Sequence, residues 1–158
     1  IDVKYIPIIL ELAKREYDVI LVDTNHILNE VNLMILDNSY MSLFMVTNDL
    51  LDLKNMKSIV SIFKDTDKKN FLIVLNNSRD TGRDYLSLFD IRNILKCNIN
   101  FTISNSFYIK NIDKYVMNGE ILTLNKGINR FHAADIRRLD DIAIELINDK
   151  YSEGDISD

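Results

Sequence analysis

Cysteine is almost absent from this sequence, and its scarcity excludes two kinds of stabilisation. The 158 residues include a single cysteine, Cys97, so no internal disulfide can form. The two histidines, His26 and His132, have no partner at a zinc-binding spacing. This cysteine usage favours a cytosolic protein.

Proline, glycine and long apolar runs are also scarce. One proline and four glycines leave no flexible linker, so residues 1–151 are expected to form a single domain and residues 152–158 a flexible tail. No apolar run approaches the ~20 residues that a membrane helix needs, which argues against direct membrane insertion. The start of the sequence lacks both a methionine and the features of a signal peptide, so we expect a piece of a longer protein.

The sequence has fewer positively charged residues than negatively charged ones. Nineteen lysines and arginines stand against 24 aspartates and glutamates, which gives a formal net charge of -5. A field of that sign repels a phosphate backbone, so no nucleic-acid partner is expected. The apolar share of 47% is sufficient for a buried core. The abundance of asparagine, isoleucine, lysine and aspartate suggests a bacterial source with an AT-rich genome.

Apolar segments of two kinds alternate along the chain. Short continuous runs predict buried strands at residues 17–23 (YDVILVD), 42–47 (SLFMVT), 71–76 (FLIVLN) and, more weakly, 99–104 (INFTIS). Apolar residues at helical spacing predict helices near residues 5–12, 30–36, 53–64, 86–96, 109–118 and 136–147. This order predicts an α/β fold in which a parallel sheet carries helices on both faces.

Polar residues end the predicted strands, where ligands bind in sheets of this kind. Asp23 could hold a metal's water or polarise an attacking one, and Asn76 and Asn77 could hydrogen-bond the edge of a base. Thr47 and Ser104 end the other two runs. An aspartate that caps a turn and an asparagine-rich turn are the structural alternatives.

Other polar residues carry weaker signals. Arg79 and Arg83 flank a glycine and could meet a phosphate or a partner's carboxylate, although such side chains are more often solvated. His26 could at most contact a bound nucleotide or water. Asp52 lies where a helix N-cap is expected.

The order of these pieces resembles the MinD/ParA group of P-loop ATPases over about residues 3–150. The resemblance rests on residues 17–24 (YDVILVDT), 46–55 (VTNDLLDLKN), 71–76 (FLIVLN) and 116–120 (VMNGE). Residues 49–57 (DLLDLKNMK) are most similar to the CpaE/TadZ branch, which helps place and assemble Flp (Tad) pili. The implied fold is that of a Rossmann-like P-loop NTPase.

The resemblance implies an ATP site with Mg²⁺ in the intact protein. Asp23 corresponds to the catalytic switch-loop acid that acts on the metal through water. Asn76 and Asn77 would lie by the adenine, and Ser104 and Asn105 beneath it. The resemblance also implies a homodimer that works with pilus or secretion components, and a cytoplasmic protein that such partners recruit to the membrane or cell pole.

Two features separate this sequence from the family pattern. Residues 25–27 (NHI) follow Asp23-Thr24, where the family has proline and glycine, and Ser104 replaces a usual proline. No G-x-x-x-x-G-K-[ST] phosphate loop occurs, so this piece should neither hydrolyse ATP nor bind it alone. We expect the phosphate loop and a central strand upstream of residue 1. The edge of the sheet beside that strand should then be exposed or covered by a partner.

Two alternatives to a pilus-assembly ATPase remain. One is a catalytically degenerate scaffold that docks pilus components, and the other, less favoured, is a partitioning ATPase.

Overall fold

The computed structural model of the chain describes residues 2–25, 27–65, 70–77, 86–107 and 109–152. Within these ranges the strands are β1 (Ser42–Thr47), β2 (Phe71–Asn76) and β3 (Phe101–Ile103). The helices are α1 (Ile6–Glu16), α2 (Glu30–Asp37), α3 (Leu50–Asp65), α4 (Leu88–Leu95), α5 (Ile112–Met117), α6 (Lys126–Phe131) and α7 (Ala133–Ser152). Two 3-10 turns, η1 (Val3–Tyr5) and η2 (Leu122–Leu124), complete the assignment.

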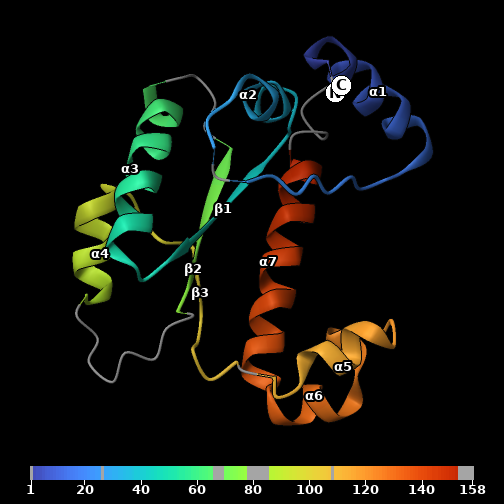
Figure 1. Ribbon diagram of the computed structural model, residues 1–158, viewed down its shortest axis with the longest axis vertical. Helices are drawn as coiled ribbons and strands as arrows, with labels where there is room; N and C mark the ends of the chain where they lie inside the picture. The colour runs from blue at the N-terminus through green and yellow to red at the C-terminus, as the bar shows by residue number, and fades with distance from the viewer. Residues whose placement is uncertain (1, 26, 66–69, 78–85, 108, 153–158) are drawn as a thin grey trace.

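The three strands form one parallel sheet in the order β1-β2-β3 (Figure 1). Ser42 of β1 pairs with Phe71 of β2, and Val74 of β2 pairs with Phe101 of β3. Parallel neighbours need a long crossover, and α3 and α4 provide the two crossovers in this sheet. The predicted α/β class is therefore confirmed.

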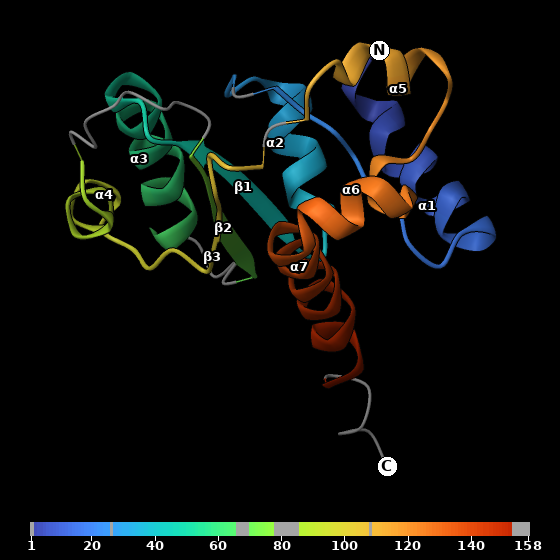
Figure 2. The ribbon, with the colours of Figure 1, turned by 90° about the horizontal axis from the view of Figure 1, so that it is seen from below.

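Helices cover both faces of this sheet. On one face, α3 and α4 pack against side chains such as Phe44, Val46 and Ile73, and all belong to the main hydrophobic core. On the other face lies α7 (Figure 2), and its Ile142 packs against Val74 and Ile103. Residues of β2 alternate between these two cores, as expected for a strand buried on both sides.

An aromatic cluster closes the main core near the start of the sheet. The Phe44 and Phe63 rings meet edge to face with centroids 5.0 Å apart, and Phe71 lies 5.9 Å from Phe44. Edge-to-face pairs add to the stabilisation that burial of the rings provides. The cluster ties α3 to two strands at once.

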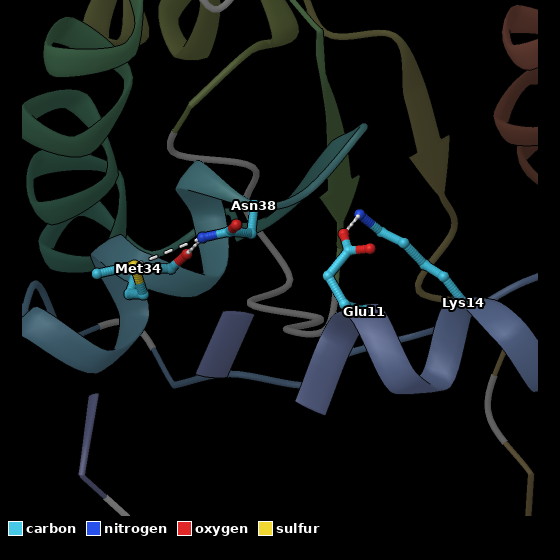
Figure 3. A network of polar contacts seen from close by, with 4 residues as sticks. All are labelled: Glu11, Lys14, Met34 and Asn38. Carbon is cyan, nitrogen blue, oxygen red and sulfur yellow. Dashed lines mark hydrogen bonds and ion pairs between the residues drawn. The ribbon is translucent and has the colours of Figure 1, made fainter. Parts of the chain in front are cut away.

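Short polar side chains define the ends of several helices. Asn29 caps the start of α2, and the Asn38 side chain donates back to the Met34 carbonyl at its end (Figure 3). Gly119 follows the C-cap of α5 with φ of +67°, a left-handed conformation that glycine adopts without a side-chain clash. The helix predicted near residues 109–118 therefore ends where it was expected to end.

The first predicted strand is not present. Residues 17–23 are irregular and lie between α1 and α2, with Val19 62% exposed and Leu21 85% exposed. A strand is assigned through its pairing with a neighbour, and β1 is the outermost strand on this side of the described sheet. Residues 17–23 are apolar as a buried strand would be, but the prediction that they pair in the sheet is wrong for the described chain.

The polar face of α1 is well defined although the helix covers none of the sheet cores. Lys14 Nζ lies 2.7 Å from Glu11 Oε1, and this hydrogen bond lowers the pKa of Glu11 below its ordinary value (Figure 3). The apolar residues Ile8, Ile9 and Leu12 of this helix remain exposed. The contacts of α1 are with α2 and η1.

The last predicted feature, the tail at residues 152–158, falls almost wholly outside the described residues. Ser152 is the final residue of α7, and the structure describes nothing beyond it.

No described helix combines the length and the apolar character that crossing a membrane would require.

Candidate functional site

The carboxyl ends of the three strands lie in register at one edge of the sheet. Thr47 pairs with Asn76, and Asn76 pairs with Ile103, so the last residues of all three strands share one line. One residue further on, the Asn77 amide donates to the Ile103 carbonyl at 3.1 Å. The predicted residues Asn76, Asn77 and Ser104 therefore come from neighbouring chain ends at the edge where ligands of parallel sheets bind.

A compact turn follows β3 and includes the predicted residues Ser104 and Asn105. The Ser104 hydroxyl lies 2.9 Å from the Ser106 hydroxyl and accepts a 3.1 Å hydrogen bond from the Ser106 amide. The Phe107 amide donates to the Ser104 carbonyl at 3.1 Å. A serine hydroxyl thus shapes the turn at the position where the resemblance leads one to expect a proline.

The end of β1 is bound tightly to the start of α3. One carboxylate oxygen of Asp52 accepts from both the Thr47 amide at 2.7 Å and the Thr47 hydroxyl at 2.8 Å. The spacing predicts Asp52 as the N-cap of this helix, but the structure does not place it there. That role belongs to Asp49, whose carboxylate accepts from the amides of Leu51 and Asp52. Asp52 instead fixes the strand end from inside the first turn.

Asp23 stands apart from the other predicted residues. It lies in the exposed segment between α1 and α2, and no hydrogen bond or strand pairing among the described residues connects it to Asn76. Its predicted role toward a metal-bound water stays a prediction. Among the described residues, no group of three or more metal-binding side chains gathers at one place.

The segment after Asp23 is held to α2 by a buried amide. The Asn32 side chain is buried and donates to the Asn25 side chain at 2.7 Å and to the Ile27 carbonyl at 2.7 Å. The Asn25 side-chain oxygen also accepts from the Ile27 amide at 3.2 Å. These bonds fix the path of the chain at the place where the resemblance suggests a switch loop.

The remaining predicted positions are two arginines and two histidines. Arg79, Arg83 and His26 lie outside the described residues. His132 contacts the Phe107 ring edge to face, with centroids 5.4 Å apart, and this contact connects the turn after β3 to the start of α7.

Sequence reasoning missed one residue that positions the site. Asn100, directly before β3, accepts from the Ile73 amide through its side chain at 2.8 Å and donates its own amide to the Ile73 carbonyl at 2.9 Å. This clamp fixes the register of β3 against β2, and with it the position of Ser104 relative to Asn76. An asparagine just ahead of a short strand was the available signal.

The polar groups at the carboxyl edge fit one part of a nucleotide. Amides such as Asn76 and Asn77 offer both donors and acceptors, which suits the edge of a purine. The hydroxyl and amide groups of Ser104 and Asn105 add a second polar surface next to them. A phosphate chain, by contrast, needs backbone amides from a glycine-rich loop or a helix start, and the 158 residues contain no such loop sequence.

Comparisons with known proteins identify the fold. No protein-family model matches the chain, and no curated protein matches it by sequence. A ParA family ATPase from Chlorobium tepidum TLS has a similar structure, with a TM-score of 0.61 and 19% identity over 76% of this chain and 48% of the other.

Two structures from Aquifex aeolicus are similar as well. The MinD cell division protein gives a TM-score of 0.65 at 22% identity, covering 88% of this chain and 61% of that one. A chain of the MinC:MinD cell division protein complex gives 0.66 at 21% identity, covering 88% and 59%.

These similarities define the class of fold. The chain has the α/β fold of ParA and MinD proteins, and it spans about half to three fifths of the length of these relatives. The predicted fold is confirmed, and membership of the superfamily and the finer features of the resemblance remain proposals.

Proposed function

We propose that these residues form the base-binding part of a ParA/MinD-like ATPase-fold protein that binds ATP with Mg²⁺ when intact. The fold and the polar carboxyl edge around Asn76 and Ser104 support this proposal. Within the group, the CpaE/TadZ-like sequence at residues 49–57 favours a cytoplasmic factor that helps position or assemble Flp pili. Such a factor would act as a homodimer together with pilus or secretion components.

One observation carries the proposal: no described residue pairs with the outer edge of β1, and the apolar groups beside this edge are exposed. Phe44 and Val46 face the core under α3 and α4, so the alternate residues Leu43 and Met45 face the α7 side, where each is 38% exposed. A parallel sheet normally buries both faces. The apolar residues Val19 and Leu21 are still more exposed. A further strand beside β1, paired also with residues 17–23, would cover all of these groups.

That further strand would come from an upstream part of the protein and would lead into the phosphate-binding loop. Backbone amides of such a loop would bind the β- and γ-phosphates, and bound Mg²⁺ would neutralise their charge. Asn76 and Asn77 would orient the adenine, and Ser104 and Asn105 would hold its other side. Asp23, at the end of the completed strand, would orient water next to the metal.

ATP titration of the longer protein tests these roles. Asn76→Ala should weaken ATP binding about tenfold, because a base hydrogen bond is lost from a desolvated site. Asp23→Ala should reduce Mg²⁺-dependent turnover while leaving the affinity for ATP nearly unchanged. Asn55→Ala and Asp140→Ala, exposed substitutions of the same kinds on α3 and α7, serve as controls. If Asn76→Ala and Asp23→Ala behave like these controls, the proposed site is wrong.

A specific observation favours a second candidate, a scaffold of the same fold without hydrolysis. The Asn32 side chain ties the segment after Asp23 to α2 through Asn25 and Ile27, whereas a switch loop must move when the γ-phosphate leaves. A partitioning ATPase that binds DNA is disfavoured by the net charge of -5.

The upstream sequence separates the first two candidates. An intact phosphate loop with its lysine supports the ATPase, and a loop without that lysine supports the scaffold. The Asn32→Ala variant adds a functional comparison. If it confers or increases ATP turnover in the longer protein, the tie between α2 and the segment after Asp23 restrains catalysis.

A further inference from the structure

A shallow, positively charged hollow that is wide open to solvent lies far from the candidate nucleotide site. It has a volume of about 520 Å³ and is lined by three cations, two amides and a thiol, namely Lys64, Arg92, Lys96, Asn93, Asn98 and Cys97. α3 leads into the start of β2 and α4 into the start of β3, so their C-terminal ends lie where the strands begin. The hollow is therefore at the opposite end of the sheet from Asn76 and Ser104.

A hydrogen bond from the Lys64 side chain connects the end of α3 to the end of α4. The Lys64 ammonium, from the last turn of α3, donates to the backbone carbonyl of Lys96. The Lys96 amide in turn donates to the Arg92 carbonyl at 2.8 Å. Lys64 thus reaches across to the end of α4, although like charges would otherwise favour separation of these side chains.

Lys96 occupies a backbone conformation that disfavours any side chain. Its φ of 58° is in the left-handed region, at the end of a helix where glycine is strongly preferred. The chain accepts this backbone strain and keeps an exposed lysine at the mouth of the hollow. Backbone conformations of this kind cluster at functional sites, which makes Lys96 a candidate for a binding role.

The positive charge of the side chains that line the hollow exceeds the partial negative charge of the two helix C-termini beside it. Each helix C-terminus has about half a negative charge, so the ends of α3 and α4 offset about one of the three cations. The side chains of Arg92 and Lys96 make no ion pair or hydrogen bond with the described residues. Burial raises the pKa of Cys97 above its ordinary value of 9.0, and Lys64 only partly opposes this rise. The thiol is therefore neutral near pH 7 and cancels none of the charge.

We propose that this hollow binds the phosphate group of a small soluble phosphate ester. A phosphate monoester carries nearly two negative charges near pH 7, which matches the charge of about two that the helix ends leave uncompensated among the described side chains. The Arg92 guanidinium presents a planar pair of donors that suits phosphate oxygens. The ammonium of Lys96 and the amides of Asn93 and Asn98 supply the further donors that such a group accepts.

Titration of the 158-residue chain with inorganic phosphate and with glycerol 3-phosphate tests the site. The side-chain amide NMR signals of Asn93 and Asn98 should shift saturably with both ligands and not with glycerol. Bound phosphate should also slow the alkylation of Cys97 by iodoacetamide. A preference for glycerol 3-phosphate over inorganic phosphate would show that the site reads the organic part as well as the phosphate.

Lys96→Gly is the decisive variant, because glycine suits the backbone at this position and the fold should be retained. It should weaken phosphate binding about tenfold, as should Arg92→Gln. Lys57→Gln removes an exposed cation of α3 that does not line the hollow, and it should change the affinity less than about twofold. The proposal is overturned if phosphate causes no saturable shift, or if Lys57→Gln weakens binding as much as Lys96→Gly does.

Discussion

Asp52 joins a strand end to a helix with one carboxylate oxygen. Thr47 supplies both hydrogen bonds, one from its amide and one from its hydroxyl, so the end of β1 cannot move without α3. Because Asn76 pairs with Thr47, this contact also helps hold one side of the candidate site.

Thr47→Val should lower the free energy of unfolding by about 1 kcal/mol, because valine fits a strand but leaves Asp52 without its hydroxyl donor. Thr102→Val, a matched change within β3, should have little effect, since the Thr102 hydroxyl makes no hydrogen bond with a described residue. Urea unfolding of both variants measures the difference. Equal losses in the two proteins would mean that the Thr47–Asp52 bond contributes nothing.

The sequence predicted some site residues and missed others for a physical reason. Asn76 and Ser104 follow from the ends of apolar runs, because parallel strands bring their carboxyl ends to one edge. The Asp52 contact does not follow, since an aspartate near a helix start fits either the cap or the first turn. Only the three-dimensional path of the chain after Thr47 decides between them.

At the scale of elements, α4 depends on a reciprocal cap at its start. The Ser87 hydroxyl accepts from the Asp90 amide, and the Asp90 carboxylate accepts from the Ser87 amide and hydroxyl. These bonds, the hydroxyl first, lower the pKa of Asp90 below its ordinary value of 3.8.

Ser87→Ala should therefore cost about 1 kcal/mol of stability at neutral pH. The part due to Asp90 is present above the pKa of the unfolded chain, and it is lost as the pH falls through the lower pKa of the folded state. Thermal unfolding between pH 7 and pH 2 measures the gap in melting temperature between wild type and Ser87→Ala. This gap should narrow at the acid end of the range. Ser58→Ala, on the exposed side of α3, should show no such gap at any pH.

Helices and strands differed in how well the sequence predicted them. A helix satisfies its own backbone, so apolar spacing alone located α2, α3, α4 and α7 to within a few residues. The helix predicted at residues 109–118 is shorter because Asn111 has a φ of 58° and interrupts it. Residues 17–23 have the composition of a strand, but a strand also needs a neighbour to pair with, and composition does not supply one.

At the scale of the whole molecule, the sheet core and the exposed segment at residues 17–23 should contribute very unequally to stability. Leu53 is fully buried between α3 and the sheet, so Leu53→Ala should lower the free energy of unfolding by about 3 kcal/mol. Leu21→Ala should change it by less than about 0.5 kcal/mol, because this side chain remains in water.

The same pair of variants tests the proposed further strand. In a longer protein that carries the upstream segment, Leu21 should become buried and Leu21→Ala should then cost about 2 kcal/mol or more. Chemical denaturation of both lengths gives the comparison. If Leu21→Ala is neutral in the longer protein as well, residues 17–23 do not form the strand that we propose.

The parallel register of the sheet affects how the chain folds while the ribosome synthesises it. Ser42 finds its first partner only in Phe71, and Val74 finds its partner only in Phe101. In the longer protein, the proposed upstream strand would be synthesised first and could pair with β1 at once. The described residues of the 158-residue chain contain no strand before β1, and their parallel strands cannot pair as hairpins, so β1 stays unpaired until α3 and β2 have been synthesised. During that interval the nascent chain is most open to capture by chaperones, and slowing translation between β1 and β2 should lengthen it.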